Sequence, residues 1–310
     1  MRTLQDLHNE FISMQRNVRR MRETTIKSYE EAFRVFKKLT WDDITPDRLT
    51  PDVMTNFFEK LNTRERKVGA ISKSGVKSST TRTYYAKLNA FFKWLEKRKI
   101  IGMSPFEGIE IPKVKYEDTR YLTKSQVEKI MTTVTVNIGW HNDLIRKRNI
   151  AMFYILLFTG LRKGELLGLK ILDFDFAGNM LTVRPETSKS KDTRSIPLNH
   201  RVMSAVKDYI EVRRGFHSEY LFITERGEAF TEFGLKHLVA KIVKESGIRF
   251  HVHRFRHTFA MNMINMGVDV VKLQYLMGHK DIRQTSVYLR KMPSIMVRNT
   301  VEFLDFDRLI

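Results

Sequence analysis

Apolar side chains recur at three- and four-residue spacing through the first hundred residues, a pattern that predicts amphipathic helices. The clearest stretch runs from Ser78 to Lys99, and Gly102 and Pro105 end it. A Thr-Pro-Asp sequence at residues 50–52 is a typical helix start, with Thr as N-cap and Pro at the first helical position. The four predicted helices cover residues 4–14, 25–39, 50–61 and 78–99.

Two segments break this pattern. Residues 67–77 are rich in Gly, Ser and Lys, so we expect a loop between the third and fourth helices. Residues 111–119 contain Pro112 and charged residues without helical spacing, as a linker does. Thr123 and Gln126 then form a potential capping box that opens a second unit. We therefore expect one domain in residues 1–110, a linker in 111–119 and a second domain in 120–310.

The second domain contains an unusually apolar helix. Residues 150–161 are apolar on all sides, which predicts a helix buried in the core and ending at Thr159-Gly160. Arg162 follows directly, and burying an unpaired arginine is costly. Glu165 lies three residues further on and is the expected partner.

Beyond this helix the period changes to alternation. Residues 180–185 and 193–198 read as two short strands, joined by a hairpin loop at 186–192. Further amphipathic helices are predicted at residues 202–213 and 232–245. The expected fold class is mainly α with a small β-sheet (α+β).

The charge of the chain indicates a class of binding partner. The net charge is +20 and the isoelectric point is near 10.0, which favours a polyanionic partner, nucleic acid before an acidic membrane surface. Residues 1–113 hold 23 Lys and Arg against 14 Asp and Glu, and the remainder holds 32 against 21. Both halves are basic, as expected of two domains that close on one duplex.

Targeting signals and disulfides are not expected. The chain has no cysteine, which excludes disulfides and thiolate metal sites. The first twenty residues include four arginines and lack an apolar stretch typical of a signal peptide. The longest apolar run is too short to span a bilayer. We expect a cytoplasmic protein with no membrane association.

The stretch from His253 to Tyr288 carries the candidate chemistry. His253 and Arg256 are three residues apart, so a helical turn places them on one face. His279 and Tyr288 follow, the tyrosine on another short helix. A tyrosine hydroxyl has an ordinary pKa of about 10, so it needs cations and proton acceptors nearby to attack a substrate. Ordinary core packing of these side chains is the simpler alternative. A zinc site is disfavoured, because the arginines would repel the cation.

Family resemblance decides between these readings. The sequence HRFRH at 253–257, followed by GHKDIRQTSVY at 278–288, resembles the signature of the tyrosine recombinase (phage integrase) family. One departure is Met277, where the family usually has Leu. Residues 159–166, TGLRKGEL, resemble the first arginine motif of the same family.

The resemblance implies six catalytic residues. Lys189 lies in the predicted hairpin loop, eight residues before Pro197, and matches the family's catalytic lysine, with Lys191 as its competitor. By this resemblance the tyrosine attacks a backbone phosphate and two arginines clamp the phosphate oxygens. The lysine protonates the leaving 5′-oxygen, one histidine adds a donor, and His253 accepts the tyrosine proton or supports the phosphate. The implied catalytic residues are Arg162, Lys189, His253, Arg256, His279 and Tyr288.

The N-terminal helices resemble the family's SAM-like core-binding domain, a four-helix unit that contacts DNA. Its fourth helix begins SSTTRTYYAK, which offers hydroxyl groups and cations near free backbone N–H groups. A capped and solvated helix start, with solvated loop lysines, is the alternative. The implied DNA-contacting residues are Thr81, Arg82, Lys87, Lys73 and Lys77.

The reaction implied is site-specific DNA strand exchange through a 3′-phosphotyrosyl intermediate, without ATP, metal or cofactor. The implied partners are double-stranded DNA with a specific recombination site and a homotetramer formed through a C-terminal helix around residues 297–306. That helix docks either on its own domain or on a neighbouring subunit. A nucleoid-associated location follows, in Xer-like resolution of chromosomes or plasmids or in movement of a mobile element. The alternatives are a non-catalytic DNA-binding protein with the same fold and a type IB topoisomerase-like enzyme.

Overall fold

The computed structural model describes residues 2–40, 45–68, 71–111, 121–188 and 192–289. It divides into two compact units, Met1–Glu117 and Asp118–Ile310, and each unit has its own hydrophobic core. Among the residues described, no helix is long and apolar enough to cross a membrane. Most of the predicted linker and the whole predicted C-terminal interaction helix lie outside the described ranges.

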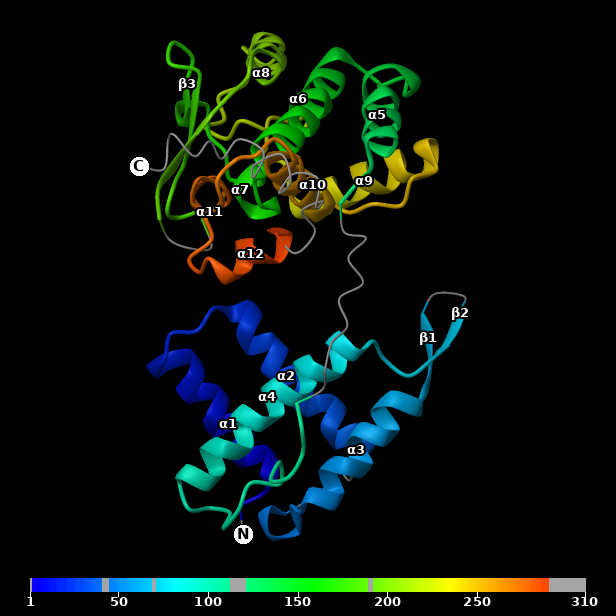
Figure 1. Cartoon of the computed structure of the whole chain (residues 1–310), viewed down its shortest axis with the longest axis vertical. Coiled ribbons are helices and arrows are strands. Elements are labelled where there is room, and N and C mark those ends of the chain that lie inside the picture. Colours follow the sequence, from blue (N-terminus) through cyan, green and yellow to red (C-terminus); the bar gives the residue numbers. More distant parts are fainter. Residues whose placement is uncertain (1, 41–44, 69–70, 112–120, 189–191, 290–310) are drawn as a thin grey trace, which may run out of the picture. The chain divides into compact units, whose positions relative to one another are not determined.

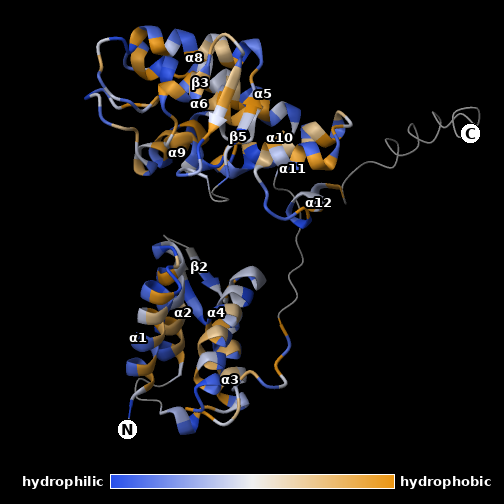
Figure 2. Ribbon diagram, turned by 90° about the vertical axis from the view of Figure 1, so that its left-hand side faces the viewer, coloured by the Kyte–Doolittle hydropathy of each residue, from blue (hydrophilic) through white to orange (hydrophobic). Residues whose placement is uncertain are grey.

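The first unit consists of four α-helices and a β-hairpin (Figure 1). The four predicted helices are confirmed, and Thr50 is the N-cap before Pro51. Hydrophobic and hydrophilic residues alternate along each helix in Figure 2, as amphipathic helices require. The bounds are α1 Leu4–Ser13, π-helical η1 Met14–Val18, α2 Glu23–Leu39, 3-10 helical η2 Pro46–Arg48, α3 Pro51–Thr63 and α4 Ser78–Lys97.

Aromatic rings fill the space between these helices. His8 stacks on Phe33 with 3.9 Å between ring centroids, and Phe91 meets the same histidine edge-on at 5.0 Å. Burial lowers the pKa of His8 to about 4, so the ring is neutral near pH 7 and behaves as one more aromatic of the core.

The loop predicted between the third and fourth helices is wrong. Strands β1 Glu65–Val68 and β2 Ile71–Ser74 pair antiparallel, with Arg66 opposite Lys73. The strands carry polar residues on both faces, so they lack the alternation of a half-buried strand. Only the β-branched Val68 and Ile71, on either side of the turn, hinted at pairing.

The second unit packs its helices around α6, Asp143–Thr159. Asn142 caps the start of α6 by accepting the backbone N–H of Ile145, and α8 and α10 pack against the helix (Figure 1). The predicted capping box of Thr123 and Gln126 is confirmed. The other helices are α5 Lys124–Thr132, π-helical η3 Thr133–Asn137, α7 Lys163–Leu167, 3-10 helical η4 Ile171–Asp173, α8 His200–Val212, α9 Glu232–Ser246, α10 Val252–Asn265, α11 Val270–Met277 and α12 Arg283–Leu289.

A three-stranded antiparallel sheet stands at the edge of this unit. Strands β4 Met180–Val183 and β5 Arg194–Pro197 match the two predicted strands, with Val183 opposite Arg194. Strand β3 Phe174–Asp175 completes the order β3-β4-β5 and is too short to leave an alternating pattern. The predicted class, mainly α with a small β-sheet, is confirmed.

Candidate active site

Arg162 is placed by the end of one helix and the start of the next. Gly160 ends α6 in the left-handed conformation with φ +62°, and Arg162 is the N-cap of α7. Its Nη1 donates to Oε1 of Glu165 at 2.8 Å, and its backbone N–H donates to Oε2 at 2.9 Å. The expected Glu165 partner is thus confirmed. Nη2 donates to the carbonyl of Gly278 at 2.9 Å, so Arg162 joins α7 to the end of α11.

Arg256 lies on α10 and is almost wholly buried, with 5% of its surface exposed. Its Nη1 donates to the carbonyl of Gly160 at 2.7 Å, and its Nη2 donates to that of Met277. Burial, reinforced by the positive charge of Arg162, lowers the pKa of Arg256 to about 9, which leaves the guanidinium protonated at neutral pH. Arg162 and Arg256 are therefore both tied to residues 277–278.

His279 follows this turn and is half-buried. Its Nδ1 lies 2.9 Å from Oγ1 of Thr285, which is buried at the start of α12. Burial, followed by the charges of Arg256, Arg162 and Arg194, lowers the pKa of His279 to about 3. The imidazole is neutral at pH 7 and carries a single N–H.

Tyr288 lies on α12 with only 8% of its surface exposed. It packs in a small apolar cluster from α10 and α11 that includes Met261, Leu273 and Met277. Its hydroxyl lies 2.7 Å from Nδ1 of His257, one residue after Arg256 on α10. A nucleophile candidate is thus in direct contact with a ring nitrogen that accepts a proton in the tautomer with its N–H on Nε2.

His253 has a different place. It lies in the first turn of α10 and its side chain is exposed. Desolvation and then the charge of Arg256 lower its pKa. The imidazole that contacts the tyrosine hydroxyl is His257, four residues later on the same face of the helix. The motif HRFRH at 253–257 includes His257, but the family resemblance assigns it no role.

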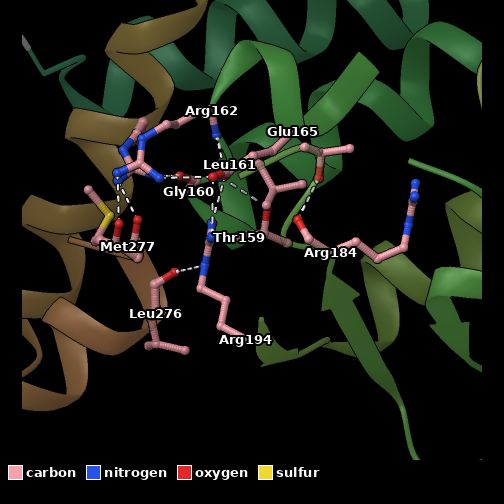
Figure 3. A network of polar contacts seen from close by, with 12 residues as sticks. Thr159, Gly160, Leu161, Arg162, Glu165, Arg184, Arg194, Leu276 and Met277 are labelled. Atoms are coloured by element: carbon pink, nitrogen blue, oxygen red, sulfur yellow. Dashed lines mark hydrogen bonds and ion pairs between the residues drawn. The ribbon is translucent and has the colours of Figure 1, made fainter. Parts of the chain in front are cut away.

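Arg194, the first residue of β5, completes the cluster (Figure 3). Its side chain is 3% exposed, and its Nη2 donates to Oε2 of Glu165 at 2.7 Å. Burial alone would raise the pKa of Glu165, but hydrogen bonds and charge from Arg194 and Arg162 hold it below its usual range. Around one carboxylate, the chain gathers three guanidinium groups, an excess of positive charge suited to an anion such as a phosphate.

This arginine cluster lies within the part of the chain that matches the model of a known protein family. The model of the phage integrase family matches residues 120–294, more than half of the chain. The chain belongs to the phage integrase family.

Family relatives align over nearly the whole chain. Tyrosine recombinase XerA of Saccharolobus solfataricus is 30% identical over 285 residues, which are 91% of this chain and 87% of that protein. A tyrosine recombinase of Thermosipho africanus is 28% identical over 276 residues, 88% of this chain and 90% of that one. This member of the family is accordingly a tyrosine recombinase.

Two solved structures share the fold of this chain. The Tn1549 transposon integrase, solved in complex with a circular intermediate DNA, superimposes with a TM-score of 0.76 at 23% identity, over 93% of this chain and 95% of that one. The XerH site-specific recombinase bound to a palindromic difH substrate gives 0.69 at 19% identity, over 94% and 82%. These likenesses show the shared fold.

Among the six residues predicted from the family motifs, Arg162, Arg256 and His279 meet at residues 277–279, and Tyr288 lies on the adjoining α12. Lys189 and its competitor Lys191 lie outside the described ranges. Within those ranges, no group of three or more His, Asp or Glu side chains could hold a metal ion.

The predicted DNA-contacting residues divide into two groups. Arg82, Lys73 and Lys77 are exposed around the start of α4. Lys87 is half-buried, with its Nζ 4.1 Å from the centre of the Tyr29 ring. Thr81 is 6% exposed, and its hydroxyl donates to the side chain of Asn62 at 2.8 Å. Its hydroxyl is therefore engaged inside the unit, and we leave Thr81 out of the contacts proposed below.

Proposed function

We propose that this recombinase cuts and rejoins DNA strands at a specific site, with Tyr288 as the nucleophile and a 3′-phosphotyrosyl enzyme as the intermediate. The observation that carries the proposal is the contact between the Tyr288 hydroxyl and Nδ1 of His257, beside two arginines held at one turn. A phenol that is to attack a phosphate needs a place for its proton and cations for the growing charge.

In the proposed cleavage step, one bond to phosphorus forms and another breaks. The tyrosine oxygen forms a bond to phosphorus, the bond from phosphorus to the 5′-oxygen breaks, and the phenol proton passes to His257. Lys189 protonates the leaving 5′-oxygen, which is otherwise a poor leaving group. The reverse attack by a 5′-hydroxyl of another strand restores the phosphodiester. One phosphodiester replaces another, so the step needs no external energy source.

Arg162 and Arg256 would hold the non-bridging phosphate oxygens. A guanidinium has five N–H groups, and the contacts to the protein described above account for two side-chain donors in each arginine. These contacts fix the guanidinium planes before DNA binds, which is the preorganisation that transition-state stabilisation requires. Neutral His279 adds one N–H donor, and His253, exposed beside Arg256, supports the phosphate.

The N-terminal unit, residues 1–110 in our proposal, would grip the duplex. Arg82, Lys73 and Lys77 are exposed around the start of α4, and Lys87 lies further along the same helix. The net charge of +20 supports a DNA partner for the whole chain. We further propose a tetramer on the recombination site, assembled through the C-terminal segment, and a place in the cytoplasm with the nucleoid.

A covalent-adduct assay tests the proposal. The protein is mixed with nicked duplexes from its own genomic neighbourhood, which trap cleavage, and is run on a denaturing gel. We expect a slow-migrating protein–DNA band that Tyr288→Phe abolishes. Tyr154→Phe is the matched control, because Tyr154 is half-buried on α6, its ring stacks on Phe158, and no contact of the site described above uses it. That variant should keep the band.

Three results would contradict the proposal. A band that persists in Tyr288→Phe would assign the nucleophile to another residue. A verified binding site that gives tight binding and no band would favour a non-catalytic DNA-binding protein. Relaxation of supercoiled DNA by single protomers, with no exchange between sites, would indicate a topoisomerase-like enzyme.

A further inference from the structure

Three arginines cap three consecutive carbonyl groups at the end of α11. Arg194 Nε donates to Leu276 at 2.9 Å, Arg256 Nη2 donates to Met277, and Arg162 Nη2 donates to Gly278 at 2.9 Å. The last carbonyls of a helix lack partners within it, so side chains from elsewhere can satisfy them. The three arginines come from β5, α10 and the start of α7. His279 follows directly, so its position depends on all three.

Arg194 also occupies the hydrogen-bond acceptor positions of Glu165 that Arg162 leaves open. Oε1 of this carboxylate accepts from Arg162 Nη1 at 2.8 Å and from Arg194 Nη1 at 3.2 Å. Oε2 accepts from the Arg162 backbone N–H at 2.9 Å and from Arg194 Nη2 at 2.7 Å. A carboxylate has about four acceptor positions, and these four contacts fill them. Arg194 therefore fixes the carboxylate that orients Arg162.

The same arginine accounts for the glycine before His279. Gly278 has φ +60°, a conformation that favours glycine. A Cβ at this position would lie 2.7 Å from Arg194 Nη1, closer than real contacts allow. The Gly-His pair thus provides room for a guanidinium as well as a turn.

Arg194 also joins the hairpin to this turn. It is the first residue of β5, after the loop that contains Lys189, and it pairs with Val183 of β4. A second tie lies next to it, where the backbone N–H of Ser195 donates to the hydroxyl of Tyr275 on α11 at 3.1 Å. The start of β5 and the end of α11 are held together at two adjacent residues.

We propose that Arg194 is a positioning residue for strand cleavage: it fixes Glu165, and through it Arg162, and it holds the end of α11 from which His279 extends. The inference rests on the proposed function. At 3% exposure Arg194 is covered by the protein, so it acts through these neighbours and not on the phosphate. Its three donors point at two partners on different elements, a geometry that the single ammonium of lysine cannot reproduce.

The experiment compares Arg194→Lys with a matched control, Arg184→Lys. Arg184 follows β4 in the same unit and also joins a carboxylate to a carbonyl, donating to Asp173 Oδ1 at 2.7 Å and to Gly168 at 2.7 Å. It makes none of the contacts to α11 described above. Single-turnover adduct formation on the nicked duplex is measured for both variants, with melting temperature as the test of folding.

Two substrates separate positioning from general damage. One carries the ordinary scissile phosphodiester, and the other carries a neutral methylphosphonate, which places less negative charge in front of the arginines. For Arg194→Lys we expect an adduct rate about 10- to 100-fold lower on the phosphodiester, the size of effect that misplaced catalytic groups produce. The loss on the methylphosphonate should be much smaller. Arg184→Lys should change both rates little and equally.

Glu165→Gln provides a second variant on the other side of the same contact. If both residues act through one arrangement, the double variant should lose little more than the worse single variant. If Arg194→Lys fails to fold, Glu165→Gln tests the inference instead, through the ratio of its adduct rates on the phosphodiester and the methylphosphonate. Equal losses on both substrates, or a normal rate in Arg194→Lys, would overturn the inference. Absence of any adduct in the unmodified chain on a verified site would instead overturn the proposed function.

Discussion

At the scale of single residues, the protonation of His279 decides what this side chain can do. With a pKa of about 3, the ring is neutral and has one N–H. Its Nδ1 faces the hydroxyl of Thr285. If that hydroxyl donates, the remaining ring N–H is on Nε2 and is the group that can reach a phosphate oxygen.

The low pKa has a measurable consequence for two histidines. We expect the Cε1–H signals of His8 and His279 to stay constant in a ¹H–¹³C NMR titration from pH 8 to 5.5, because burial holds their pKa values at about 4 and about 3. His8→Phe and His279→Gln identify the signals. A midpoint near the ordinary value of 6.5 for either ring would contradict the burial described here.

The direction of the stability effect follows from the same shifts. Both rings have a folded-state pKa below the unfolded value of about 6.5. Their contribution to stability is fully present above that pH and is lost as the pH falls toward 4 for His8 and toward 3 for His279. Acid should therefore weaken both units.

Residue-level sequence reasoning found the arginines and missed their support. Arg162 was recognisable because it follows a wholly apolar helix, and Glu165 because it lies three residues away. Arg194 lies in a predicted short strand, and no motif assigns it a role. Alternation places it on the same face as buried Ile196, and that signal, an arginine on a buried face, was present in the sequence. The hydrogen bonds that it makes to α11 join residues 82 positions apart, which no local pattern reveals.

At the scale of elements, two helices can be compared that end in a glycine with the left-handed conformation. Both α6 and α9 end in a glycine with positive φ, Gly160 at +62° and Gly247 at +69°. A Cβ on Gly160 would lie 2.5 Å from the ring of Phe259, whereas a Cβ on Gly247 would meet nothing within 4 Å. The carbonyl of Gly160 also accepts the Arg256 hydrogen bond.

Substituting each of these two glycines separates the cost of the left-handed backbone conformation from the cost of crowding a neighbouring side chain. We expect Gly247→Ala to cost about 1 kcal/mol of folding free energy, the strain of the left-handed conformation. Gly160→Ala should cost about 1–3 kcal/mol more, because the Phe259 ring must also move. Chemical denaturation followed by circular dichroism measures both. Equal losses of folding free energy in the two variants would mean that the Phe259 ring moves aside without cost. Only Gly160→Ala should also lower the rate of adduct formation, since it displaces an Arg256 acceptor.

Element prediction succeeded where amphipathic periods were long. Helices α2 and α4 run for 17 and 20 residues and leave several turns of signal. The hairpin β1–β2 was mistaken for a loop because its four-residue strands have no apolar face. Strand β3, two residues long, owes its conformation to pairing with β4 and not to its own sequence.

At the scale of the whole molecule, charge is spread over both units. Exposed cations that contact phosphates release counterions from DNA, so binding weakens with salt in proportion to their number. We expect Arg82→Ala to reduce the slope of log affinity against log salt by about 1. Lys93→Ala, an exposed cation at the other end of α4, should leave the slope unchanged. Fluorescence anisotropy at several salt concentrations measures both, and identical slopes would remove Arg82 from the DNA contacts.

The negative C-terminal ends of two helices act on the electric field at the proposed phosphate site. Both α6 and α11 direct their C-terminal ends at Arg256, through the carbonyls of Gly160 and Met277. The C-terminal end of a helix carries roughly half a negative charge, whereas anions are usually bound at the opposite end. Here the backbone itself would repel a phosphate. The guanidinium groups must first reverse the sign of that field, so loss of Arg256 would expose a bound phosphate to the negative ends of both helices.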